Sequence, residues 1–166
     1  MKKKVWYGLI VAVVIVCGIV LLNTQMHKNE KTVEDFLKTA FAKTEENTGL
    51  YEQLQAGGTV MGEGVDEETQ KESIEKSKEA EDAFQKAYGK YMNDSCLEEF
   101  LGVYASYVTE LHSEGETCEV SEVQVEEDAE AYKFQVTLTV DGAKRELTGR
   151  AEVTDGKISG FELTQY

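Results

Sequence analysis

Residues 132–154 read YKFQVTLTVDGAKRELTGRAEVT, and this stretch decides the fold. Over its first nine residues, apolar side chains alternate with polar ones, which is the period of a β-strand that buries one face. The pair Asp141-Gly142 follows, and it is typical of a two-residue hairpin turn. A second alternating run then begins at Ala143. The stretch therefore predicts an antiparallel hairpin with one apolar and one polar face.

Two further strands extend this hairpin to a meander. Residues 118–126 precede it, and residues 157–166 follow it after a second Asp-Gly turn signal. In the last strand, Ile158 has one parity and Phe161 has the other. We therefore expect a β-bulge at Ser159-Gly160, which would bring both side chains to the same face.

Three segments with helical spacing come before the strands. The first covers about residues 32–55, and the second begins with acidic residues near 66 and ends near 93. The third starts with a capping box at Ser95 and ends around residues 112–115. Helices grouped in sequence beside an antiparallel meander predict an α+β domain, with three helices packed on a four-stranded sheet.

A long apolar run stands near the start of the chain. Residues 5–22 read VWYGLIVAVVIVCGIVLL and carry no charge. As a helix they would extend roughly 27 Å, close to the thickness of a bilayer core. We expect an uncleaved transmembrane anchor. A cleaved signal peptide is the alternative, but its apolar region is usually shorter and is followed by small residues.

The charge is distributed unevenly along the 166 residues. The formal net charge is −15, made up of +4 over residues 1–28 and −19 over the remainder. Three lysines before the apolar run keep the N-terminus in the cytoplasm, so the rest would lie outside the cell membrane. We expect a tip and anchor over residues 1–22, a polar tether over 23–31 and an extracytoplasmic domain over 32–166. The acidity excludes a nucleic-acid partner.

Aromatic side chains on the second and third helices are the candidate site. They could line a pocket, or they could simply pack the helices on the sheet. The histidine at the end of the third helix could serve such a pocket as an acid–base group, or it could be a surface residue near the helix dipole. The candidate pocket residues are Tyr88, Tyr91, Tyr104, Tyr107 and His112.

Cys96 and Cys118 are two cysteines of the expected extracytoplasmic domain. An even pair outside the cytoplasm favours a disulfide. A long third helix would separate the two residues, so two buried free thiols are the alternative.

The residues offer no nucleophile–base pair, no metal-ligand spacing and no cofactor motif, so we expect no enzyme, metal or cofactor.

The helix–helix–helix–meander order, and the closing run LTGRAEVTDGKISGFEL at 147–163, resemble the nuclear-transport-factor-2-like (cystatin-like) superfamily. The resemblance implies a cone-shaped fold. It also implies a small membrane-anchored domain of the bacterial cell envelope, like some secretion and conjugation components. We expect the chain to act through protein–protein contacts, with binding of a small apolar ligand or peptide in the cone as the alternative.

Overall fold

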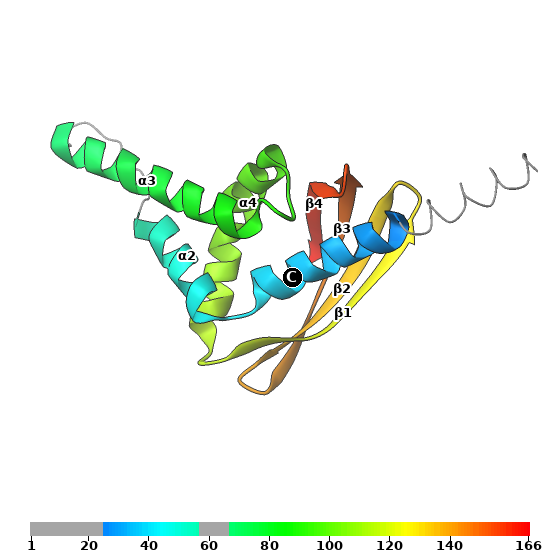
Figure 1. Cartoon of the computed structure of the whole chain (residues 1–166). Coiled ribbons are helices and arrows are strands. Elements are labelled where there is room, and N and C mark those ends of the chain that lie inside the picture. Colours follow the sequence, from blue (N-terminus) through cyan, green and yellow to red (C-terminus); the bar gives the residue numbers. More distant parts are fainter. Residues whose placement is uncertain (1–24, 57–66) are drawn as a thin grey trace, which may run out of the picture.

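The computed structural model of the chain describes residues 25–56 and 67–166 (Figure 1). The predicted membrane anchor, residues 1–22, lies outside these ranges. Within them, no helix combines the length and the apolarity needed to cross a bilayer.

The described residues form an α+β fold with four helices and a four-stranded antiparallel sheet, which confirms the predicted class. The first helix, called here the N-terminal helix, covers residues 25–41. The other elements, in chain order, are α2 (Glu45–Ala56), α3 (Glu67–Tyr88), α4 (Asp94–Glu114), β1 (Cys118–Asp128), β2 (Ala131–Val140), β3 (Ala143–Thr154) and β4 (Lys157–Gln165).

The first predicted helix is wrong in two respects. It starts earlier, because residues 25–31 are helical where a tether was predicted. It also breaks at residues 42–44, where the Lys43 amide donates to Cys118 O at the start of β1 (2.8 Å). The Thr44 hydroxyl then accepts from the Asn47 amide (3.1 Å) and so caps α2. A tertiary contact and a local cap together end one helix and begin the next.

The start of α4 also differs from the prediction. Asn93, rather than Ser95, is the N-cap, and its side-chain oxygen accepts from the Cys96 amide (2.8 Å). Asparagine is as good a cap as serine, so the capping box was not needed to start the helix. α3 ends earlier than predicted, at Tyr88, and residues 89–91 form a turn before α4.

The sheet agrees closely with the prediction. Its strands lie in the order β1-β2-β3-β4, and all pairs are antiparallel. Asp141 and Gly142 have φ angles of 47° and 85°, as a two-residue hairpin turn requires. Glu152 pairs with Gly160 and Val153 with Ile158, so Ser159 is the extra residue of the predicted bulge.

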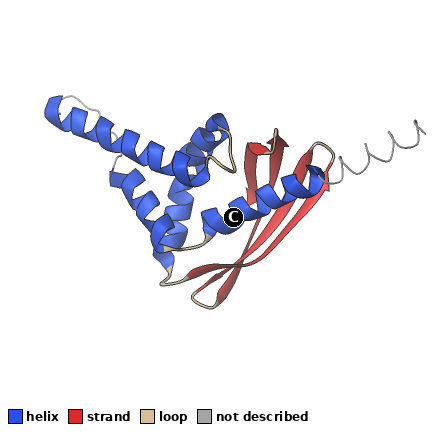
Figure 2. Ribbon diagram, viewed as in Figure 1, coloured by secondary structure: helices blue, strands red, loops and turns tan. Residues whose placement is uncertain are grey.

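The N-terminal helix crosses one face of the sheet and α4 contacts β4, whereas α2 and α3 lie farther from the sheet and pack against α4 (Figure 2). The N-terminal helix runs from the β3–β4 turn, where Thr32 bonds Gly156 O, to the start of β1. Phe36 is fully buried at the centre and makes edge-to-face contacts with rings from α4 and β4 at 5.3 and 5.4 Å. The core therefore lies between this helix, α4 and the sheet.

The edge of the sheet formed by β4 is covered by the helical layer. The Ile158 amide donates to Tyr91 O (2.7 Å), and the Asn93 amide donates to Ile158 O (3.0 Å). Further along, the Leu163 amide donates to the Tyr104 hydroxyl on α4 (3.1 Å). The outward backbone groups of β4 at these positions therefore have partners within the chain.

Candidate functional site

Tyr88 is part of the core. Its hydroxyl donates to the side-chain oxygen of Asn47 (2.9 Å). The side-chain nitrogen of Asn47, Nδ2, donates in turn to Ala42 O (2.8 Å) and to Thr39 O. Burial raises the pKa of Tyr88 to about 12, so its hydroxyl keeps its proton at neutral pH. This buried polar cluster joins α3 to α2 and to the end of the N-terminal helix.

Tyr91 and Tyr104 also serve packing. Because the Thr39 hydroxyl donates to Asp35 O (2.7 Å), the Tyr91 hydroxyl donates to Thr39 (3.2 Å). Tyr104 is buried, and its hydroxyl oxygen accepts a hydrogen bond from the Leu163 amide. Both hydroxyls therefore bind protein groups.

Tyr107 is half-buried, and its ring lies 4.8 Å from that of Tyr166. Phe100 connects Tyr88 with Tyr104 at ring distances of 6.5 and 5.8 Å. The structure thus brings Tyr88 and Tyr104 together through a phenylalanine inside the core, and it leaves Tyr107 at the surface.

His112 lies in the last turn of α4, but it is only 4% exposed. Its Nε2–H donates to Phe41 O (3.3 Å), and its ring meets Tyr51 edge to face at 5.7 Å. Burial lowers the pKa of His112, so the imidazole is neutral at pH 7 and does not act as a cation on the helix dipole. A surface role for this residue is therefore wrong.

Two buried side-chain polar atoms have no hydrogen-bond partner within residues 25–56 and 67–166: the Tyr51 hydroxyl oxygen and His112 Nδ1. Both residues border a depression of about 300 Å³ between α2 and α4, which Lys43 and Glu52 also line. The four predicted tyrosines do not line it. His112 is thus separated from the tyrosines with which it was grouped.

The disulfide considered from the sequence does not form in the structure. Cys96 and Cys118 are both buried free thiols. From Cys96 to its end at Glu114, α4 extends roughly 27 Å, and Cys118 follows four residues later at the start of β1. Burial raises the pKa of Cys96 to about 11, and the Cys118 thiol donates to Phe41 O (3.5 Å). Each cysteine therefore acts as a small buried side chain.

No group of three or more His, Cys, Asp or Glu side chains that could hold a metal ion occurs in the described part of the chain.

A groove of about 660 Å³ lies on the helical side of the molecule, between α2, α3 and α4. Leucines form its floor: Leu97 is buried, and Leu54 and Leu101 are half-buried. Four exposed carboxylates stand around it, and its lining from the described part of the chain includes no lysine or arginine. These acidic residues are Glu81, Asp82, Asp94 and Glu98.

Within residues 25–56 and 67–166, no lysine, arginine or histidine forms an ion pair with the rim carboxylates. Asp94 accepts a hydrogen bond from the Gln85 side chain (2.7 Å), which is neutral. The groove therefore combines apolar area with uncompensated negative charge.

The sequence interpretation missed this groove. On each helix by itself, acids beside leucines look like a solvated face next to a core face. The groove arises because α2 and α3 pack on α4 and leave the leucines partly uncovered between them. In the sequence, the acids at 79, 81 and 82 directly follow Lys78, so this charged run resembles any other solvated helix face.

The chain was compared with known proteins. No protein-family model and no curated protein matched it. Among solved structures it is similar to the solution NMR structure of a de novo designed β-sheet protein, with 21% identity over 73% of this chain and 83% of the other. The TM-score of that match is 0.35.

Proposed function

We propose that the chain is a non-enzymatic, single-pass membrane protein whose domain lies outside the cytoplasm and binds a partner protein at the cell envelope. The groove between α2, α3 and α4 is the observation that supports this proposal. It offers apolar area that a partner could bury, inside a ring of carboxylates that would orient a basic segment. The anchor and its orientation rest on the charge pattern of residues 1–28.

The resemblance to the nuclear-transport-factor-2-like superfamily stays part of the proposal. A four-stranded antiparallel meander with a helix across one face is compatible with it. The alternative function, a ligand inside the cone, has no supporting observation of its own. Phe36, Phe84 and Phe100 are buried. Phe36 packs against Phe100, and both Phe84 and Phe100 pack against Tyr88, so aromatic rings fill the interior where such a ligand would lie.

Photo-crosslinking in the source cells tests the groove. A photoreactive phenylalanine analogue at Leu101 would lie on the groove floor, whereas the same analogue at Val103 serves as the matched control. The two positions are separated by roughly 200° around α4, and Val103 is 55% exposed. We expect a discrete adduct with one protein from position 101 and none from 103.

A charge-reversal variant tests whether the groove carboxylates are needed for crosslinking to the partner. Glu81→Lys with Glu98→Lys should abolish it, because the substitutions place cations where the partner's cations would lie. Glu152→Lys with Glu162→Lys makes the same charge change on the sheet and should leave the adduct intact. Equal adducts from positions 101 and 103, or none from either, would contradict the proposed function.

A further inference from the structure

The opposite edge of the sheet, β1, differs from the covered edge. The alternation of backbone groups along a strand turns the N–H and C=O of Val120, Val123 and Val125 away from β2. Cys118 is one such outward residue whose carbonyl has a partner, the Lys43 amide. Beyond it, no backbone hydrogen bond joins outward groups of β1 to any other described residue.

The side chains along this edge are apolar on the inner face. A bulge at Ser121 brings Val120, Val123 and Val125 to the same face of the sheet as Val136 and Phe134 of β2. The three edge valines are half-buried and pack against the core. A strand added beside β1 would pair the free backbone groups and cover these valines at the same time.

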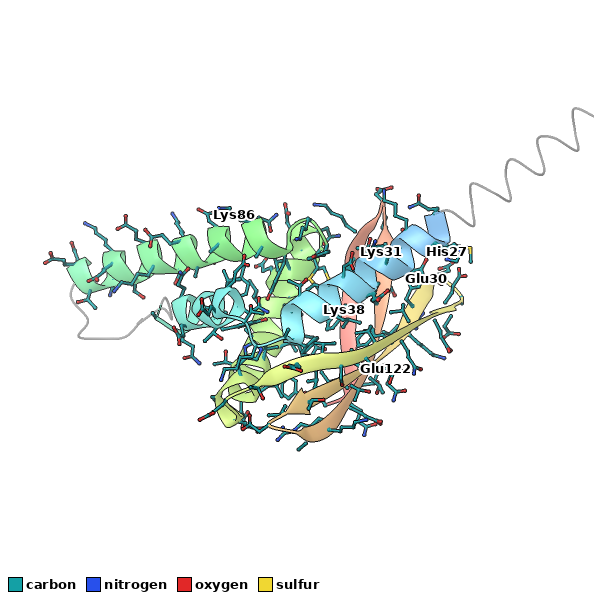
Figure 3. All side chains as sticks on the ribbon, turned by 60° about the horizontal axis from the view of Figure 1, so that its bottom comes forward. His27, Glu30, Lys31, Lys38, Lys86 and Glu122 are labelled. Carbon is teal, nitrogen blue, oxygen red and sulfur yellow. The ribbon has the colours of Figure 1, made fainter. Side chains whose placement is uncertain are left out.

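The outer face of β1 is acidic. Glu119, Glu122 and Glu126 are exposed and form no ion pair with another described residue (Glu122 in Figure 3). Two copies of β1 paired antiparallel would place carboxylates of the same face against one another, and like charges in facing positions destabilise a sheet. A second copy of this chain is therefore a poor occupant of the edge.

We propose that the open edge of β1 binds an extended segment of a partner protein as a fifth strand. The segment carries lysine or arginine at alternate positions, opposite Glu122 and Glu126, and apolar residues between them, over Val123 and Val125. Backbone hydrogen bonds supply the pairing, and the alternate side chains supply the selectivity. This surface shares no residue with the groove between α2, α3 and α4, so a negative binding result at one site does not contradict the proposal for the other.

A proline substitution isolates the edge. Val123→Pro removes a backbone donor that points away from β2, so the hydrogen bonds between β1 and β2 remain, and proline is tolerated at such edge positions. Val123→Ala is the matched control, because it loses the same side chain and keeps the N–H. The probe is a short synthetic peptide in which lysine and valine alternate, with a glutamate–valine peptide beside it.

Binding is measured on the full chain in nonionic detergent, by peptide titration and by hydrogen exchange at single amides. We expect the lysine peptide to slow exchange of the Val123 and Val125 amides by about tenfold or more. Val123→Pro should weaken binding about tenfold relative to Val123→Ala. The glutamate peptide should not bind, and added salt should weaken the lysine peptide.

Three results would overturn the proposal. Slow exchange at Val123 and Val125 without peptide would mean that the edge is already covered, by the chain itself or by a second copy. Equal binding by the proline and alanine variants would mean that no added strand forms. Protection of α4 amides in place of β1 amides would assign the peptide to the groove.

Discussion

The two edges of the sheet, β4 and β1, are treated differently by the same chain. β4 is held by backbone bonds from Tyr91 and Asn93 and by the Tyr104 hydroxyl. β1 is held at its first residue by Lys43, and from Val120 onward its outward backbone has no hydrogen-bonded partner among the described residues. The residues between α3 and α4, together with α4 itself, satisfy the outward backbone groups of β4, and no described residue does the same for β1 beyond Cys118. The contrast therefore marks β1 as the edge available for pairing.

Substitutions at the covered edge, β4, should lower the free energy of unfolding more than substitutions at β1. Phe161→Ala on β4 should lower the free energy of unfolding by about 3–5 kcal/mol, because its buried ring contacts Phe36, Phe100 and Phe134. Denaturant unfolding of the full chain measures this loss. A loss below about 1 kcal/mol would contradict the assignment of the core to this edge.

The hydroxyl of Tyr104 should account for part of that stability. Tyr104→Phe leaves the buried Leu163 amide without its acceptor, and we expect a loss of about 1–2 kcal/mol. Exchange of the Leu163 amide should accelerate about tenfold, toward the behaviour of the open edge. Tyr107→Phe is the control, because the Tyr107 hydroxyl makes no hydrogen bond to another described residue and its loss should change little.

The pH dependence of stability tests a residue of the helical layer, His112, that belongs to neither edge of the sheet. Burial lowers the pKa of folded His112 below its unfolded value of about 6.5, so the unfolded chain binds the proton first. Stability should therefore fall as the pH drops below about 6.5, with a slope under about 1.4 kcal/mol per pH unit. His112→Gln should flatten this slope.

The open edge should contribute least. Val123→Ala removes a half-buried side chain, and we expect a loss of only about 0.5–1 kcal/mol in denaturant unfolding. A loss as large as that of Phe161→Ala would show that β1 is structurally as essential as β4. The comparison between the edges would then fail.

The sheet could be predicted because its signals are local. Alternation from Tyr132 to Val140 and the two Asp-Gly pairs specify strands and turns without reference to other parts of the chain. The bulge at Ser159 followed from a parity conflict between neighbours in sequence. Each of these features needs only a few consecutive residues.

The helical layer was harder to predict because its features depend on distant contacts. The break at residues 42–44 needs the start of β1, 75 residues after Lys43 in the chain. Asn47 is buried only because Tyr88 and the end of the N-terminal helix satisfy its amide. Apolar spacing alone continues through both positions, so it predicted one helix instead of two.

The candidate site depended even more on tertiary packing. The tyrosine spacing located Tyr88 and Tyr104 in the core but also included Tyr107, which lies at the surface, and it could not say whether a pocket opened among them. The groove needs three helices in their final arrangement, and its aspartates and glutamates belong to no motif that the sequence marks. The open edge of β1 likewise follows from the strand order, which becomes visible only when β4 is seen to be covered.

The contact between Phe36 and Phe161 has a consequence for the order in which the chain can fold. One partner lies in the first described helix and the other in the last strand, so the core cannot close until synthesis reaches the C-terminal strand. At usual rates of synthesis this interval is on the order of ten seconds. Throughout it, the apolar faces of the helices stay uncovered, and contacts this distant in sequence also slow the folding that follows.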